Sequence, residues 1–210
     1  MVNRSISKQT LLRLPLYLNY MKQLGENTPE HISATTIAEA LRLNHVVVRK
    51  DLAAVSSAGK PKVGYNTEAL IAELEEFLGY NDVDDAIIVG AGKLGKALLT
   101  YGGFKHCGMN IVAAFDIDEE VCEEDYGGKR ILTMDKLMEL CERMRGIIAV
   151  PAENAQAICN LLIESGILAI WNFAPVHLDV PEGILVHNEN LAASLALLSK
   201  QLKEKFDANT

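Results

Sequence analysis

The sequence predicts an α/β protein in which an N-terminal winged helix-turn-helix precedes a Rossmann-like, doubly wound parallel sheet. The first observation is a charge difference: the formal net charge is −8, yet residues 1–62 hold nine Lys/Arg and only four Asp/Glu. The second is the stretch AIIVGAGKLGKALL at residues 86–99, in which an apolar run leads through three glycines into another apolar run. The third is the alternation of strand-like and helix-like segments from residue 86 onward, which is typical of a mostly parallel sheet. A basic N-terminal part in an acidic chain indicates contact with a polyanion.

The composition is that of a globular protein, with 49% hydrophobic and 23% charged residues. No apolar stretch reaches the roughly 18 residues that cross a bilayer, and the first ten residues lack the apolar core of a secretory signal. We therefore expect a cytoplasmic protein that does not enter a membrane. The four cysteines, Cys107, Cys122, Cys141 and Cys159, form no Cys-x-x-Cys pair, so we expect reduced thiols and no metal site.

The N-terminal part is predicted to form three short helices. Residues 7–24 place leucines at helical spacing, and Pro15 is expected to kink this helix or to mark a start within it. Thr36 and Glu39 form a capping-box pattern that opens a second helix. Asn44 is expected to cap a third helix, HVVVRKDLAAVSSAG. The helical period allows four residues of this third helix to face inward: Val47, Val48, Leu52 and Val55.

Three short helices followed by a basic extended segment have the order of a winged helix-turn-helix. The third helix would lie in the major groove, where Arg49 and Lys50 contact phosphates or base edges, and Lys60 and Lys62 would do so from the wing. The alternative is a plain helical cap whose charged faces are solvated. We expect a DNA-binding domain over residues 1–80, a nucleotide-binding domain over 81–188 and a C-terminal helix over 189–210.

The glycine-rich stretch matches the G-x-G-x-x-G pattern of dinucleotide-binding turns at Gly90, Ala91, Gly92, Lys93, Leu94 and Gly95. In this pattern the first glycine permits the tight turn, the second lets the backbone approach a pyrophosphate, and the third lets the helix pack on the strand. Asp116 follows 21 residues after Gly95, where an acid accepts hydrogen bonds from the adenine ribose and disfavours a 2′-phosphate. The pattern therefore predicts NAD⁺/NADH as the cofactor; the alternative for Asp116 is a structural role in a turn. Asp118, at the same strand end, is a second candidate, and Lys93 is expected to add affinity.

The alternation predicts five strands, at residues 86–89, 111–115, 147–150, 168–171 and 184–186. Between them it predicts three helices, at residues 94–101, 134–143 and 154–165. The last helix carries an apolar stripe that either packs on its own domain or reaches a partner subunit, and the pattern does not choose between these. The stripe consists of Leu191, Leu195, Leu198, Leu202 and Phe206.

The sequence offers no recognisable set of catalytic residues. A dehydrogenase needs a proton donor or acceptor beside the nicotinamide. The candidates Tyr101, His106, His177 and His187 lie in no catalytic motif, and no second, substrate-binding domain is evident. The residues therefore favour a sensor over an enzyme. Two alternatives stay open: an oxidoreductase with a helical cap, and a nucleotide- or CoA-binding module that signals to a protein partner.

A series of motifs in the same order resembles the Rex family of redox-sensing transcriptional repressors. The motifs are RKDL (49–52), GK (59–60), VGY (63–65), GAGKLGKALLTYGGF (90–104), AAFDID (113–118), VPAENAQ (150–156) and NFAPVHLDVPEGILVHN (172–188). The resemblance implies a homodimer whose C-terminal helix is exchanged between subunits. It also implies operator binding when NAD⁺ dominates and release when NADH rises. It further implies a nicotinamide site near Pro151, Asn172 and Phe173, with Tyr101 taking part in the switch.

The chain departs from the family pattern on the surface expected to face DNA, which comprises His45, Val47, Arg49, Lys50, Lys60, Lys62 and Tyr65. Val47 replaces the usual Gln, residues 53–56 read AAVS in place of Ser-Tyr-Phe-Gly, and Pro61-Lys62 replaces Arg-Gly in the wing. We expect an altered operator preference or weaker binding. An arginine and an aspartate that the family links through the tyrosine are Asn19 and Asn190 here. A neutral pair is less sensitive to salt than an ion pair, so we expect NADH to release DNA with a coupling of altered size.

Overall fold

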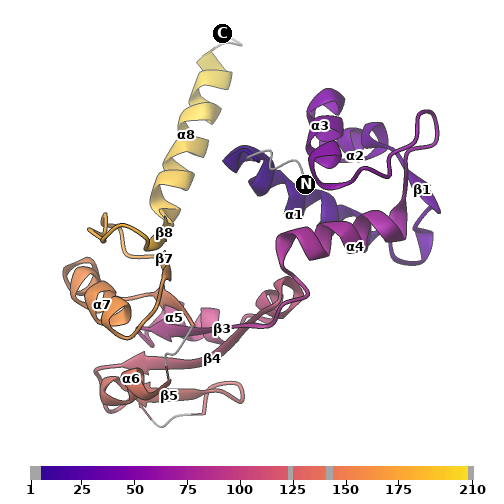
Figure 1. The fold of residues 1–210 in the computed structure, drawn as a ribbon. Coiled ribbons are helices and arrows are strands. Elements are labelled where there is room, and N and C mark those ends of the chain that lie inside the picture. Colours follow the sequence, from indigo (N-terminus) through magenta and orange to yellow (C-terminus); the bar gives the residue numbers. More distant parts are fainter. Residues whose placement is uncertain (1–5, 123–124, 141–143, 208–210) are drawn as a thin grey trace. The chain divides into compact units, whose positions relative to one another are not determined.

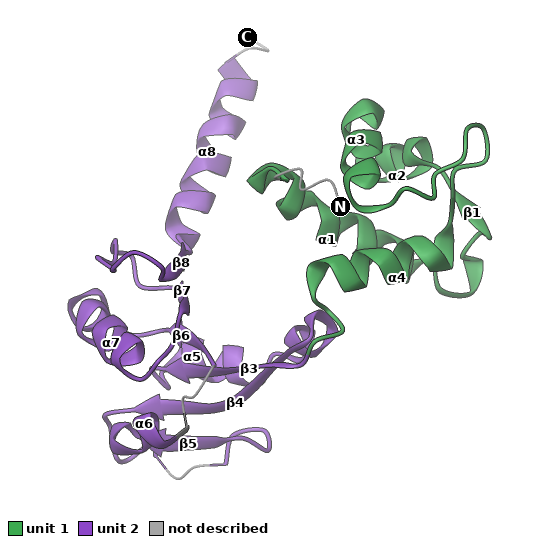
Figure 2. Cartoon of the chain, viewed as in Figure 1, with its two compact units in different colours: residues 1–82 green, residues 83–210 purple. Residues whose placement is uncertain are grey.

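The computed structural model describes residues 6–122, 125–140 and 144–207, and the chain divides into two compact units, residues 1–82 and 83–210 (Figures 1 and 2). In its described residues, the first unit contains four α-helices, a short 3₁₀ helix (Gly25–Asn27) and a two-stranded antiparallel ribbon. The α-helices are α1 (Lys8–Gln23), α2 (Ala34–Leu41), α3 (His45–Val55) and α4 (Thr67–Leu78), and the strands are β1 (His31–Ile32) and β2 (Tyr65–Asn66). This order of helices and ribbon is the winged-helix arrangement that the sequence predicts.

The helix starts of the first unit follow from capping side chains. The Asn44 amide oxygen accepts the Val46 N–H at 2.8 Å, which confirms the predicted cap of α3. The predicted capping box of α2 is wrong, because the cap is Ser33, whose hydroxyl accepts the Thr36 N–H at 3.0 Å. Ser33 has the extended backbone of a capping residue, whereas Thr36 is already helical. Pro15 lies inside α1, which continues on both sides of it.

The inward face of α3 differs from the prediction at one position. Val48 and Leu52 are fully buried as expected, but Val47 is 38% exposed. Asp51 takes part in the buried stripe instead, because residues 48, 51, 52 and 55 share one face at 3.6 residues per turn. Val47 is therefore a surface residue of α3, and a carboxylate lies in the interior of this unit.

The wing between α3 and β2 is a tight turn. The Lys60 N–H donates to the Gly64 carbonyl at 2.8 Å, and the Gly64 N–H donates back to the Lys60 carbonyl at 2.9 Å. Lys62, inside the turn, has a left-handed backbone with φ 65°. Gly64 also has positive φ, and a Cβ on it would lie 2.3 Å from the Ile32 carbonyl oxygen, so glycine is required there.

The second unit contains a six-stranded parallel sheet in the order β5-β4-β3-β6-β7-β8. Its strands are β3 (Asp84–Val89), β4 (Met109–Asp116), β5 (Arg130–Thr133), β6 (Arg145–Ile148), β7 (Ala169–Asn172) and β8 (Leu185–Asn188). Its longer helices are α5 (Lys93–Leu99), α7 (Ala152–Glu164) and α8 (Leu191–Asp207). The order reverses between β3 and β6, so the doubly wound sheet has its topological switch point there.

Two differences from the prediction concern the segment after β4. Strand β5 was not expected, and the helix predicted over residues 134–143 is a 3₁₀ turn (Met134–Lys136) followed by the short α6 (Leu137–Leu140). Residues 141–143 of the predicted helix lie outside the described residues. The apolar residues of β5, Ile131 and Leu132, pack on opposite faces of the sheet, which explains why this short segment is a strand.

The sheet carries a hydrophobic core on each face. One face packs Phe115, Leu132 and Ile148 against α6 and α7. The other packs Ile88, Ala114 and Ile147 against α5 and the 3₁₀ segment Gly102–Cys107. On this second face an apolar cleft of about 400 Å³ extends over β6, β7 and β8.

The C-terminal helix α8 has no buried residue along its described length, and all five residues of the apolar stripe are more than half exposed. The stripe is therefore not covered by its own unit, which removes one of the two alternatives that the sequence left open. No helix in the described residues is long and apolar enough to cross a membrane.

Candidate nucleotide site and DNA-binding surface

The glycine-rich loop joins β3 to α5 through two close backbone contacts. Gly90 has φ 101°, and a Cβ on it would lie 2.5 Å from the Ala149 carbonyl oxygen at the end of β6. A Cβ on Gly95 would lie 1.8 Å from the Gly90 carbonyl oxygen, so only glycine lets α5 approach the loop. Gly92 differs, because nothing lies within 4 Å of its Cβ position. The loop is thus closed toward the sheet and open at Gly92, where a phosphate can approach the backbone.

Asp116 ends β4 beside this loop. Its carboxylate accepts the Ala91 N–H at 2.5 Å and the Asp118 N–H at 3.1 Å, so it holds the loop and the turn after β4 together. The structural role that the sequence left open is therefore present. Asp118 is exposed, and its carboxylate accepts the Glu120 N–H at 3.0 Å, which makes it a turn residue.

A cavity of about 370 Å³ lies at the switch point of the sheet, and its wall includes Gly90, Gly92, Asp116, Pro151 and Asn154. Four predicted cofactor residues thus come together from the ends of three strands. Ala91, Lys93, Leu94, Gly95, Asp118, Asn172 and Phe173 are not part of this wall. An open glycine backbone and an acid at the end of the second strand fit the phosphates and the adenine ribose of NAD(H).

The side chain of Asn172 is fully buried at the end of β7 and is occupied by protein partners. Its Nδ2 donates to the Ala174 carbonyl (3.1 Å), the Val176 carbonyl (3.0 Å) and Asn188 Oδ1 (2.8 Å), and its Oδ1 accepts the Ala174 N–H (2.9 Å). These bonds engage both polar atoms of the amide, and the cofactor contact of Asn172 stays a prediction. Asn172 thus shapes the loop that carries Phe173.

Aromatic rings connect this loop to the end of α5. Phe173 lies 4.5 Å from Trp171 between ring centroids, Trp171 lies 5.9 Å from Phe104, and Phe104 lies 5.1 Å from Tyr101. Tyr101 is 60% exposed at the end of this series. A Cβ on Gly103 would lie 2.3 Å from the Tyr101 ring, so the ring rests against the Gly103 backbone.

The predicted DNA-facing side chains lie on α3 and the wing. His45, Val47, Arg49 and Lys50 are exposed on α3, and Lys60 and Lys62 are exposed on the wing. A groove of about 470 Å³ separates Arg49, Lys60 and Lys62 from the start of α2. Three cations on one groove suit a phosphate backbone.

Tyr65 also lines this groove, but most of its side chain is buried. It is 7% exposed, and a Cβ on Gly59 would lie 2.7 Å from its ring. Burial raises the pKa of its phenol, with a smaller contribution from Glu73. Tyr65 packs in the core of this unit and lines the groove beside the wing, and its DNA contact stays a prediction.

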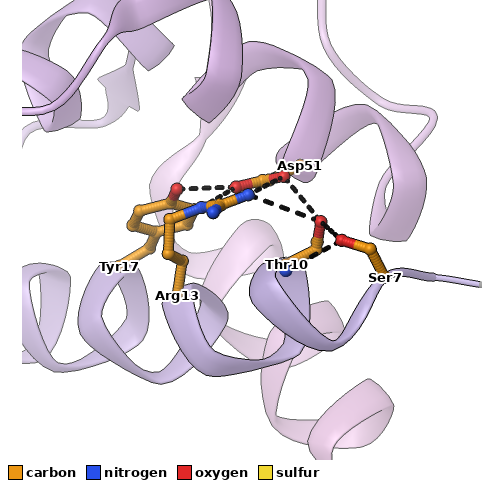
Figure 3. Close-up of polar contacts among 5 residues, drawn as sticks. All are labelled: Ser7, Thr10, Arg13, Tyr17 and Asp51. Carbon is orange, nitrogen blue, oxygen red and sulfur yellow. Dashed lines mark hydrogen bonds and ion pairs between the residues drawn. The ribbon is translucent and has the colours of Figure 1, made fainter.

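A buried polar cluster that the sequence analysis missed fixes α3 to α1 (Figure 3). Asp51 Oδ2 accepts Arg13 Nε–H (2.7 Å) and Tyr17 O–H (2.8 Å), and Oδ1 accepts Arg13 Nη2–H (2.9 Å) and Thr10 O–H (2.9 Å). Ser7 pairs with Thr10 at 3.0 Å. Arg13 and Tyr17 lie four residues apart on α1, and Asp51 is in phase with Val48 and Leu52; this spacing was the available signal.

The cluster shifts the acidity of its members. Burial acts to raise the pKa of Asp51, but hydrogen bonds from Arg13, Tyr17 and Thr10 outweigh it and hold that pKa below its usual value. Burial and the bond to Asp51 raise the pKa of Tyr17 to about 12. At neutral pH the cluster therefore contains a carboxylate, a guanidinium and a neutral phenol.

Two segments of the chain match known families: residues 5–53 match "Putative DNA-binding protein N-terminus", and residues 81–176 match "CoA binding domain". The chain is 37% identical over 206 residues to the redox-sensing transcriptional repressor Rex of Porphyromonas gingivalis, covering 97% of this chain and 94% of the relative. It is 39% identical to that of Bacteroides thetaiotaomicron, covering 94% and 91% of the two chains. It is also 39% identical to that of Treponema denticola, covering 92% and 93%.

Two solved structures of a Rex-family repressor match the fold over 99% of this chain. The structure of RSP in complex with β-NAD⁺ and operator DNA matches with a TM-score of 0.90 and 30% identity, covering 99% of this chain and 97% of that chain. RSP in complex with β-NADH matches with a TM-score of 0.86 and 30% identity, covering 99% and 100%.

The fold, the site and these relatives define a transcription regulator in which a winged-helix domain is joined to a Rossmann-like domain. The relatives are repressors, so this chain is a regulator and not an enzyme. The chain belongs to the Rex family of redox-sensing transcriptional repressors. Among the described residues, no group of three or more His, Cys, Asp or Glu side chains could hold a metal ion.

Proposed function

We propose that this protein represses transcription from operator DNA in the cytoplasm and leaves the operator when NADH rises relative to NAD⁺. The observation that carries the proposal is the pairing of a basic groove on α3 and the wing with a dinucleotide cavity at Gly90, Gly92 and Asp116. The RSP complexes with β-NAD⁺ plus operator DNA and with β-NADH support this pairing.

The first unit binds DNA, and the second unit binds the dinucleotide. Arg49 and Lys50 contact the major groove from α3, His45 and Val47 flank them, and the wing cations hold the phosphate backbone. In the second unit the loop Gly90–Gly95 receives the pyrophosphate, and Asp116 disfavours the 2′-phosphate of NADP(H). Pro151 and Phe173 border the nicotinamide half. NADH binds the arrangement that does not bind DNA more tightly, and by linkage DNA weakens NADH binding.

We further propose that two copies assemble through α8. The exposed stripe centred on Leu195 supplies the apolar face, and the open cleft on the sheet, lined by Phe104, Trp171 and Leu185, offers apolar surface of the same kind. Asn190 caps α8 by accepting the Ala193 N–H at 2.8 Å, so a change at its side chain affects the helix start. Tyr101, Asn19 and Asn190 carry the switch between DNA-binding and DNA-free arrangements.

The proposed function is tested by capturing operator fragments from genomic DNA and measuring their affinity by fluorescence anisotropy. We expect tight binding with NAD⁺, weaker binding with NADH, and no such weakening with NADPH. Arg49→Ala should reduce the salt dependence of binding by about one counterion, whereas Lys136→Ala in the other unit should not. A chain that binds no DNA at low salt contradicts the proposal.

The assembly is tested by light scattering during size-exclusion chromatography. Leu195→Asp places a charge in the stripe and should yield monomers. Ala193→Asp adds the same charge on the opposite side of α8 and should leave the dimer intact. A wild-type chain that elutes as a monomer, or equal disruption by both variants, contradicts assembly through the stripe.

A further inference from the structure

The last register pair between β7 and β8 joins the loop after β7 to the segment that leads into α8. Asn172 is paired with Asn188 across β7 and β8, and their side chains are hydrogen-bonded at 2.8 Å. Asn172 ends the strand that carries the loop with Phe173, and Asn188 lies two residues before Asn190, the cap of α8. One side-chain bond therefore spans from the cofactor-side loop to the start of the proposed assembly helix.

The Asn172 side chain, at one end of this bond, is held in place by further hydrogen bonds. The three other hydrogen bonds of the buried Asn172 side chain fix Ala174 and Val176. The neighbours of Asn172 in the chain, Trp171 and Phe173, belong to the aromatic series that leads to Tyr101. A displacement of this series or of the loop thus moves the Asn172 amide with it.

Asn188, at the other end of the bond, is exposed to solvent, whereas Asn172 is buried. The backbone supplies one parallel tie, in which the Glu189 N–H donates to the Asn172 carbonyl at 2.8 Å. A second, longer tie runs from Trp171 Nε1–H to Glu189 Oε1 at 3.4 Å. The Asn172–Asn188 bond is the shorter of the two side-chain contacts and is as short as the backbone bond, so it helps to position the segment that enters α8.

We propose that the Asn172–Asn188 hydrogen bond couples the cofactor-side loop to α8, which makes Asn188 a positioning residue for the NADH response. The inference rests on the proposed function. Asn188 contacts neither the dinucleotide cavity nor the DNA-facing groove. Removing its acceptor should therefore leave both ligand sites intact and alter only the effect of one ligand on the other.

The same loop offers a matched control. Gln156 on α7 donates to the Asp179 carbonyl and accepts the Asp179 N–H, both at 2.9 Å. This pair of bonds fixes the loop to α7 and not to α8. Gln156→Ala therefore removes two hydrogen bonds of the loop without breaking the path toward α8.

The test measures two quantities for the full chain of each variant. The first is the NADH dissociation constant, followed through the fluorescence of Trp171, the one tryptophan of the chain. The second is the coupling ratio, the operator dissociation constant with NADH divided by that with NAD⁺. Thermal melting and light scattering verify that each variant is folded and assembled as the wild type.

We expect Asn188→Ala to bind NADH within about twofold of the wild type and to lose at least about fivefold of the coupling ratio. Asn188→Asp keeps an acceptor oxygen in place and should retain the wild-type ratio, as should Gln156→Ala. The inference is overturned if Asn188→Ala keeps the full ratio, or if Asn188→Asp or Gln156→Ala loses as much. A wild-type ratio of one overturns the proposed function itself, and this inference with it.

Discussion

Asp51 in the first unit and Asn172 in the second are both buried side chains with four hydrogen bonds to other residues. Asp51 is charged, and its partners come from a helix 34 to 41 residues away in sequence. Asn172 is neutral and gathers a local loop and the neighbouring strand. A buried charge is retained only with a cation and further donors, whereas a buried amide needs only matched donors and acceptors. We call Asp51 the charged hub and Asn172 the neutral hub. Protonation of the charged hub should therefore change the stability of the first unit, whereas the neutral hub has no group that titrates.

The largest expected effect comes from Asp51→Ala. It leaves the Arg13 guanidinium and the Tyr17 hydroxyl without their acceptor and should lower the free energy of unfolding of the first unit by about 3 kcal/mol. Urea denaturation followed by far-UV circular dichroism measures this loss. Asp118→Ala, which removes an exposed turn residue, should change stability by less than about 1 kcal/mol. Equal effects of the two variants contradict the role of the cluster.

Asn172→Leu tests the neutral hub and should have a somewhat smaller effect. It leaves the Ala174 and Val176 carbonyls and the Ala174 N–H without their side-chain partner, with a destabilisation of about 2 kcal/mol. Trp171 fluorescence during urea denaturation reports on this unit. The loss should be the same at pH values of about 4 and 7, because no titrating group is removed. A loss that depends on pH over this range contradicts the comparison.

The charged hub should show its own pH window. The folded-state pKa of Asp51 is depressed, so its contribution is present above the unfolded value of about 3.9 and is lost as pH falls through the folded value. The pKa of Tyr17 is raised to about 12, so its contribution is present below the unfolded value and is lost as pH rises toward 12. Urea midpoints measured across pH should show both losses in the first unit. Asp51→Asn should flatten the acid limb, and an unchanged acid limb contradicts the assignment.

Tyr17→Phe should have the smallest effect. It removes one of the donors to Asp51 while Arg13 and Thr10 remain, so we expect a loss of about 1 kcal/mol at neutral pH. The loss of stability as pH rises toward 12 should also become smaller in Tyr17→Phe, because the titrating phenol is absent. Tyr20→Phe, a change on a half-buried tyrosine of the same helix, is the matched control. If Tyr17→Phe destabilises as much as Asp51→Ala, the cation is not the main partner of the carboxylate.

The sequence predicted the parts of the fold that depend on local patterns. The glycine loop, the cap at Asn44 and the strands flanking the loop are determined by residues close together in the chain. Strand β5 was missed because a strand of four residues with two apolar side chains carries little periodic signal. Ser33 and Thr36 are both capping residue types, and only the backbone angles distinguish them.

The two hubs were missed for a different reason. Asp51 follows Arg49 and Lys50, so the charged run indicates a solvent-exposed face, although the phase of Asp51 matches the buried stripe. For Asn172, the family resemblance implies a place near the nicotinamide and does not indicate its hydrogen bonds within the protein. These bonds include two carbonyls of a loop whose path the sequence does not specify. Hydrogen bonds to backbone groups across a loop depend on tertiary geometry, which residue patterns do not encode.

At Lys62 the backbone conformation lowers folding stability, whereas the side chain supplies a charge for the proposed DNA binding. A lysine with φ 65° occupies a conformation that glycine adopts freely and that costs other residues about 1 kcal/mol. Glycine would remove this cost, yet the position holds a cation that lines the groove proposed to bind DNA. The wing therefore combines a backbone conformation that costs stability with a positive charge. The variant Lys62→Gly should melt at a higher temperature and bind operator DNA less tightly.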